Sequence, residues 1–209
     1  MNRAIGGLLL VALLTSGCNN DDSNDSAGPV VRLPALSSGS YTVTASGDEL
    51  SFGESFYDSR GNSYLLLAAD DRTPAQIMVV SVGGAVSRIP PPAQDVSISY
   101  PSSSAGGFSA LNLISLPGRY TALVANQMIE FTLAANGAIT AGASGCKLNG
   151  ALDATKSFDQ AISASITFSS CSGIAGSYTG IAFARQDLRP ASFRIVAHNG
   201  TSVVDLLAF

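Results

Sequence analysis

The stretch CKLNGALDATKSFDQAISASITFSSC, residues 146 to 171, is the clearest structural signal in the chain. Apolar and polar residues alternate in CKLNGAL (146–152) and in AISASITFSSC (161–171), which is the period of a β-strand. Between them, DATKSFDQ (153–160) is suited to a turn. Antiparallel pairing of residue 146 with 171 places the midpoint between 158 and 159, inside that turn. The stretch therefore predicts a β-hairpin.

The two ends of this hairpin are Cys146 and Cys171, and the only other cysteine is Cys18. In an exported chain, two remaining cysteines at facing strand ends predict a disulfide. Such a bond would close the open end of the hairpin and add roughly 3 kcal/mol in the chain-entropy model. The alternative is a redox or metal pair, but with His198 as the only histidine these cysteines make a poor zinc set.

The rest of the chain beyond Leu36 is a succession of short alternating segments separated by turn residues. Hairpin turns are predicted at Asn126-Gln127, Asn136-Gly137 and Asn199-Gly200. No window carries a helical period over a full helix length. We expect an all-β, antiparallel barrel or sandwich. The further predicted strands are residues 40–46, 49–56, 63–69, 76–82, 95–100, 110–116, 119–125, 128–134, 177–184, 192–198 and 202–208.

A partial repeat suggests how these strands are organised. Gly39-Ser40-Tyr41-Thr42 recurs as Gly118-Arg119-Tyr120-Thr121, and the second half would then be the first half plus a disulfide-closed insertion. This predicts two related β units, residues 37–94 and 95–209, joined near the prolines of IPPPAQ. The alternative is one continuous domain in which Gly-x-Tyr-Thr merely begins strands, since the motif occurs a third time at 176–179.

Composition narrows the function classes. Hydrophobic residues make up 46% of the 209 residues and charged residues only 12%, with 21 glycines and no Trp. The formal net charge is −4, and Lys and Arg form no cluster that could follow a phosphate backbone. We therefore expect no nucleic-acid partner.

The amino terminus resembles that of bacterial lipoproteins. Arg3 supplies positive charge, Ile5 to Leu14 form a ten-residue apolar run, and TSGC (15–18) resembles the lipobox. The run is too short to span a bilayer of about 30 Å. The resemblance implies a signal peptide over 1–17 and a lipidated Cys18 as the first mature residue, although Thr15 stands where Leu is usual.

The resemblance also implies a cellular location and a membrane lipid as a partner. Acyl chains on Cys18 would hold the protein on a membrane. The polar and acidic residues that follow, within 18–36, predict a flexible tether. Asn19, rather than Asp, follows the cysteine, which in this class favours the outer membrane, here facing the periplasm.

No catalytic motif stands out, and we expect neither enzyme activity nor a cofactor or metal. There is no G-x-S-x-G elbow. His198 is predicted to be a solvated turn residue, although Asp205 could orient it as a base across a hairpin. Asp70 and Asp71 are predicted to be solvated in a turn.

Two sets of side chains could instead form a binding surface. Arg185, Arg189 and Arg194 either face an acidic partner or phosphate headgroups, or ring an exposed strand pair. The six tyrosines are expected in core or rim packing rather than on a sugar platform: Tyr41, Tyr57, Tyr64, Tyr100, Tyr120 and Tyr178.

Taken together, these features predict a membrane-anchored, non-enzymatic binding or envelope-assembly module with an envelope protein as partner. The alternative is a periplasmic inhibitor or immunity protein against a toxin or lysozyme.

Overall fold

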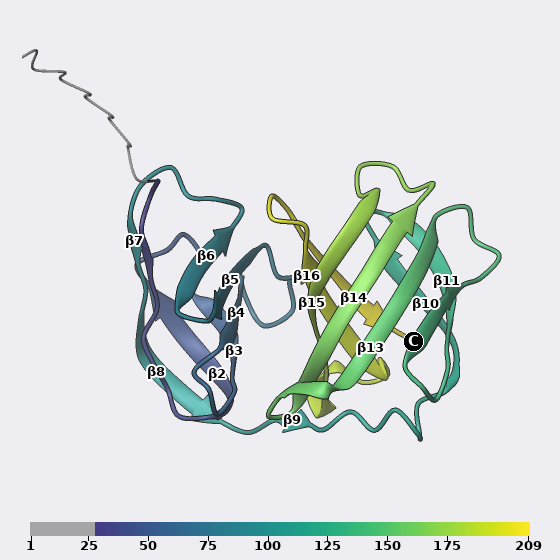
Figure 1. Ribbon diagram of the computed structural model, residues 1–209, viewed down its shortest axis with the longest axis horizontal. Coiled ribbons are helices and arrows are strands. Elements are labelled where there is room, and N and C mark those ends of the chain that lie inside the picture. Colours follow the sequence, from purple (N-terminus) through teal and green to yellow (C-terminus); the bar gives the residue numbers. More distant parts are fainter. Residues whose placement is uncertain (1–27) are drawn as a thin grey trace, which may run out of the picture.

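The structure, a computed structural model, describes residues 28–209, so the predicted signal peptide and Cys18 lie outside the described residues. The chain forms two β units that lie side by side (Figure 1). The predicted all-β, antiparallel fold class is confirmed. A single 3-10 turn, η1 (Gln186–Leu188), interrupts the strands of the described chain. None of the helical structure in residues 28–209 is long and apolar enough to cross a membrane.

The first unit is a six-stranded antiparallel sheet with the strand order β6-β5-β4-β3-β2-β8. Two short strands, β1 (Val31–Arg32) and β7 (Val96–Ser97), pair in parallel beside it. The sheet strands are β2 (Gly39–Ser46), β3 (Phe52–Tyr57), β4 (Ser63–Ala68), β5 (Ile77–Val82), β6 (Ala85–Ile89) and β8 (Ser99–Ala105).

Both predicted boundaries of this unit need correction. The first sheet continues past residue 94, because β8 pairs with β2 along its length. The predicted tether ends before residue 36, because the main-chain N–H of Val30 donates to Asp95 and β1 pairs with β7. Pairing between residues far apart in the sequence cannot be inferred from local composition. The sequence therefore predicted both the end of the tether and the end of the first unit at the wrong residues.

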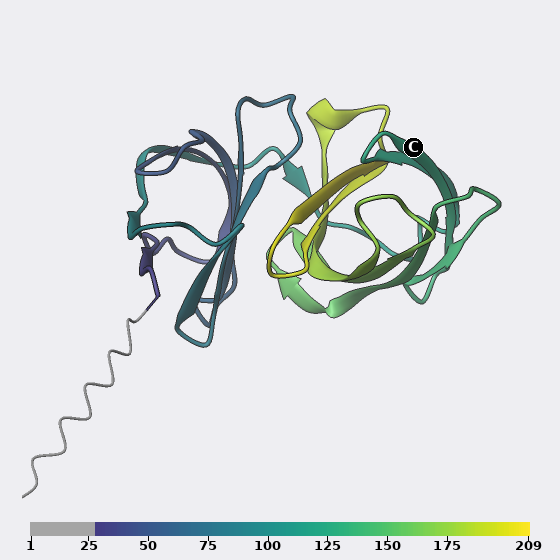
Figure 2. The ribbon, with the colours of Figure 1, turned by 90° about the horizontal axis from the view of Figure 1, so that it is seen from above.

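The second unit is an eight-stranded antiparallel barrel, seen as a ring in Figure 2. Its strands follow one another around the ring in chain order, and β9 (Phe108–Ser109) adds a short pairing on β15. The barrel strands are β10 (Gly118–Val124), β11 (Gln127–Leu133), β12 (Ala138–Ala141), β13 (Lys147–Phe158), β14 (Ala161–Ser169), β15 (Gly176–Arg185), β16 (Phe193–His198) and β17 (Val203–Ala208).

The predicted disulfide hairpin is confirmed as β13 and β14. Cys146 and Cys171 are bonded at its open end, with their Cα atoms 4.4 Å apart. The connecting loop is much shorter than predicted, because β13 continues to Phe158 and Phe158 pairs with Ala161. A bulge between Asp153 and Ser157 absorbs the turn-forming residues that the sequence placed in the loop.

Two local predictions are wrong. Residues 110–116 form a loop with a turn at 113–115 rather than a strand, and Leu111, Leu113 and Leu116 pack against the barrel core. The β10–β11 turn lies at Ala125-Asn126, both with positive φ, one residue before the predicted turn. The turns at Asn136-Gly137 and Asn199-Gly200 are confirmed by the strand pairings around them.

The predicted repeat holds for the local conformation at the start of two strands. The Tyr41 hydroxyl donates to the carbonyl of Ser37, and the Tyr120 hydroxyl donates to that of Leu116, each four residues upstream. The hairpin registers differ, however, because Tyr41 faces Ser55 whereas Tyr120 faces Phe131. Strands β13 and β14 are also two of the barrel's own strands rather than an added insertion.

Three apolar clusters hold the molecule together. The largest fills the barrel interior and includes Phe131 and Phe168. A second cluster joins the two units, since Phe56 and Met78 of the first sheet pack against Phe183 and other side chains of the barrel wall. The third lies on the opposite face of the first sheet, under β1 and β7. Strands β4 and β16, which are buried on both faces, are therefore apolar at most positions.

Candidate functional site

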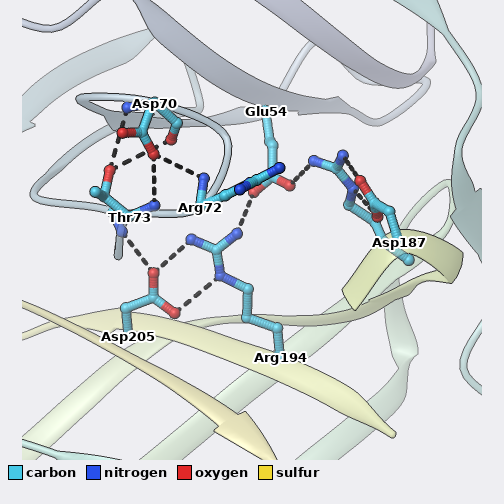
Figure 3. Close-up of polar contacts among 9 residues, drawn as sticks. Glu54, Asp70, Arg72, Thr73, Asp187, Arg194 and Asp205 are labelled. Atoms are coloured by element: carbon cyan, nitrogen blue, oxygen red, sulfur yellow. Dashed lines mark hydrogen bonds and ion pairs between the residues drawn. The ribbon is translucent and has the colours of Figure 1, made fainter. Parts of the chain in front are cut away.

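A largely buried network of charged side chains, with Asp187 at its exposed end, lies where the first sheet meets the barrel (Figure 3). Glu54 on β3 accepts from Arg194 on β16 at 2.8 Å and from Arg185 on β15. Arg185 also donates to Asp187. Arg194 forms a bidentate pair with Asp205 on β17. The network thus joins the two units at the edge of the apolar cluster between them.

Both guanidinium groups in this network stay cationic. Burial by itself would lower the pKa of Arg194, but its bonds to Asp205 and Glu54 outweigh that effect and raise it. The pKa of Arg185 is raised in the same way by Asp187 and Glu54. Both arginines bond to carboxylates of the same chain. We therefore propose that the network serves to hold the two units together.

The loop between β4 and β5 is positioned by the same network. The main-chain N–H of Ala75 donates to Asp205 at 2.5 Å, and the N–H groups of Arg72 and Thr73 donate to Asp70. Asp70 and Asp71 are exposed, as predicted. The loop is therefore held against β17 of the barrel.

The three arginines that the sequence singled out do not share a role. Arg189 is exposed, but Arg194 is buried and the Arg185 side chain is only 10% exposed, so the prediction that they ring an exposed strand pair is wrong for these two. Their acidic partner is Glu54 of the chain's own first unit. No local feature marks Glu54 for this role except a single charge within an apolar strand.

His198 lies at the end of β16 and is half-buried. Its Nδ1 accepts from the N–H of Gly200 at 3.2 Å. Burial lowers its pKa from the ordinary value of 6.5. Asp205 binds Arg194 instead of orienting this imidazole, so the catalytic pair considered from the sequence does not form.

The tyrosines take packing roles, as predicted. Tyr57 and Tyr178 are buried, and the other four are partly buried against the apolar clusters. In the first unit the hydroxyl groups of Tyr57 and Tyr100 lie 3.2 Å apart, and burial raises the pKa of both. Their phenol groups are internal and offer no platform for a sugar.

The junction between β10 and β17 differs from the other junctions of the barrel. Seven junctions carry a ladder of paired residues, whereas this one is joined in the described chain by a reciprocal pair of 3.0 Å bonds between Thr121 and Phe209. Strand alternation points the main-chain groups of Leu123 and Leu207 into the same gap. They would form the next bonded pair, but the strands are not paired there. We call this gap, from Thr121 and Phe209 to Leu123 and Leu207, the seam.

The seam is lined by both apolar and charged side chains. A cavity of about 280 Å³ lies there, and its lining combines Leu123, Leu188, Leu207 and Phe209 with Arg194, Asp205 and residues of the β4–β5 loop. A second cavity of about 440 Å³ continues from Phe209 across the outer faces of β10 and β11. Leu123, Phe209 and the cross-strand neighbour Met128 are each at least half exposed (57%, 50% and 61%). Apolar side chains clustered beside open main-chain groups suit an extended polypeptide.

Sequence reasoning missed the seam, although one signal was present. Leu123 and Met128 lie on the strand face occupied by Arg119, Thr121 and Glu130, not on the face that fills the barrel. An apolar side chain on an otherwise polar face of a strand marks a candidate contact surface. The pairing of Leu123 with Met128 follows from the turn at Ala125-Asn126, so the turn predicted one residue later did not place the two side chains opposite each other.

Comparison with protein-family models, with curated proteins and with solved structures finds no match for this chain. Within residues 28–209, no three His, Cys, Asp or Glu side chains are grouped so as to hold a metal ion.

Proposed function

We propose that this protein is a lipid-anchored component of a bacterial envelope that binds another envelope protein through the seam. The lipobox-like TSGC with Cys18 supports the anchor and the outer-membrane address. The filled barrel interior supports binding on the outside of the barrel. The observation that carries the proposal is the seam itself, where β10 and β17 carry no ladder of paired residues and exposed apolar side chains lie beside the junction.

The mode of binding follows from the seam's geometry. An extended segment of the partner would pair with main-chain groups along this junction and place apolar side chains against Leu123 and Phe209. Strand addition of this kind draws affinity from main-chain hydrogen bonds and specificity from side-chain pockets. The charges around the cavity are balanced, with Arg72 near Asp71 and Arg194 bonded to Asp205, so the segment is expected to be uncharged.

Leu123→Asp tests the seam, with Thr167→Asp as the matched control on an exposed strand position of β14. A charge at Leu123 would have to be desolvated on binding, which we expect to weaken capture of the partner from envelope extracts at least about tenfold. Thr167→Asp should capture the partner as the unchanged protein does. Equal capture by both variants would contradict binding at the seam.

Cys18→Ala tests the anchor separately. The unchanged protein should sediment with membranes, and the variant should be released into the soluble fraction. Continued sedimentation of the variant would contradict lipidation without bearing on the seam.

A further inference from the structure

The turn between β16 and β17 places a neutral base and several hydrogen-bond donors around one Asn-Gly step. Gly200 has a φ of 92°, in the left-handed region that favours glycine. The Oδ1 atom of Asn199 accepts from the N–H groups of Thr201 and Ser202 at 3.0 and 2.8 Å. It also accepts from both of their hydroxyl groups, at 3.0 and 3.1 Å.

The nitrogen of Gly200 has an unusual partner. Its N–H donates to Nδ1 of His198 at 3.2 Å, rather than to a main-chain carbonyl. An imidazole nitrogen can accept this bond only when it is unprotonated. Burial favours that state by lowering the pKa of His198.

From this geometry we propose that Asn199-Gly200 is a self-modification site, at which the folded chain converts Asn199 to an acidic residue with His198 as the general base. The Gly200 nitrogen attacks Cγ of Asn199 and forms a C–N bond, while its proton passes to Nδ1 of His198. The electron pair of the side-chain carbonyl moves onto Oδ1, where the four donors from Thr201 and Ser202 stabilise the developing charge.

The remaining steps balance without any other reactant than water. The protonated His198 returns its proton to the side-chain amide nitrogen, the C–N bond of the amide breaks, and ammonia leaves. The product is a five-membered cyclic imide between Asn199 and Gly200. Water then adds to either imide carbonyl and opens the ring, which yields aspartate or isoaspartate and one additional negative charge.

Two other Asn-Gly steps in the described chain lack this arrangement and serve as internal controls. At Asn136-Gly137 the glycine N–H donates to the carbonyl of Ala134, and Asn136 Oδ1 accepts one bond, from Ala138. Asn149-Gly150 lies within β13, and Asn149 Oδ1 accepts one bond, from Ala141. Neither site has an imidazole, because His198 is the only histidine.

The experiment follows all three sites in the intact, folded protein during incubation in neutral buffer. After reduction of the disulfide, trypsin places Asn136, Asn149 and Asn199 on three separate peptides, because it cuts after Arg119, Lys147, Lys156 and Arg194. Mass spectrometry then measures the conversion of amide to acid at each. We expect Asn199 to convert at least about tenfold faster than the other two, within the range of general base catalysis.

His198→Gln keeps an oxygen that can accept the Gly200 N–H but cannot take up its proton. We expect this variant to fold as the unchanged protein does, by circular dichroism, and to convert Asn199 at least about tenfold more slowly. In denaturant the three sites of the unchanged protein should convert at similar rates. Equal rates at the three sites in the folded protein, or an unchanged rate in His198→Gln, would overturn the proposal.

Discussion

At the scale of single residues, an ion pair in the first unit fixes a loop to a strand far along the chain. Arg88 on β6 makes a bidentate pair with Asp48, at 2.7 and 2.9 Å, and donates a third bond to the carbonyl of Pro90. Both side chains are buried, with exposed fractions of 7% and 2%. The pair therefore ties the β2–β3 loop to the edge strand β6.

Asp48→Asn should destabilise the protein by about 3 kcal/mol, because it leaves the buried Arg88 with only the exposed carboxylate of Glu49, 3.6 Å away, as an acidic partner. Chemical denaturation followed by circular dichroism would measure the loss. Asp95→Asn is a suitable control, because Asp95 pairs with Arg32 across 4.0 Å in an exposed position, where an ion pair contributes about 0–1 kcal/mol. Similar losses in the two variants would contradict the assignment.

Acid should weaken the fold through the same carboxylate. Burial by itself would raise the pKa of Asp48, but hydrogen bonds from Arg88 and Glu49 outweigh it and lower the pKa below 3.8. A carboxyl group with a lowered pKa in the folded state contributes stability that is present above its ordinary pKa. That stability is lost as the pH falls through the folded value.

We therefore expect the free energy of unfolding to decrease progressively as the pH is taken below 3.8. Asp48→Asn should show a shallower decrease, because the variant lacks the group that titrates. Denaturation curves across this pH range provide the measurement, and parallel pH profiles for the two proteins would count against Asp48 as a source of the loss.

At the scale of elements, the hairpin of β13 and β14 shows how far local pattern reaches. The alternation of apolar residues placed both strands, and the cysteines placed them next to each other. The ladder beside the disulfide is shifted by one residue from the register of the cysteine pair, since Leu148 pairs with Phe168. The bulge at Asp153 to Ser157 was not readable, because turn-forming residues also occur in bulges. Residues 110–116 were assigned to a strand for a related reason, since their apolar side chains pack on the barrel without pairing with another strand.

Replacing both Cys146 and Cys171 with Ser should lower the free energy of unfolding by about 3 kcal/mol, mainly by freeing the unfolded chain. The two cysteines are 25 residues apart in the sequence. The folded barrel should persist, because Leu148, Ile166 and Phe168 of the same hairpin remain in the interior cluster. Calorimetry of the double variant measures the change; a barrel that fails to form would show that the disulfide contributes more than a constraint on the unfolded state.

At the scale of the whole molecule, the apolar cluster between the units makes them one body. Phe183 on β15 is fully buried, and its ring lies 4.8 Å from that of Phe56 on β3 and 5.9 Å from that of Phe108, centroid to centroid. The charged network of Glu54, Arg185 and Arg194 borders the same contact. Apolar packing supplies the attraction, and the charges set which residues face each other.

Phe183→Ala should remove about 3–5 kcal/mol from the stability of the contact. We expect calorimetry to resolve two unfolding transitions in this variant, against a single transition in the unchanged protein. Phe168→Ala makes the same substitution inside the barrel and leaves a cavity in its core. This variant should unfold at a lower temperature but still in one transition. A single transition in both variants would contradict separable units.

The local pattern of the chain was enough to identify most strands, the turns at Asn136-Gly137 and Asn199-Gly200, and the cysteine pairing, because strand alternation and turn chemistry act over a few neighbouring residues. Local pattern did not identify three other features, because they depend on contacts between distant parts of the chain. These are the position of β8 beside β2, the seam, and the pairing of Glu54 with Arg185 and Arg194. Glu54 lies 131 and 140 residues from these arginines in the sequence. Only the packing of the first sheet on the barrel brings them together, because a contact at that sequence separation depends on the placement of every strand between them as well as on the charges that pair.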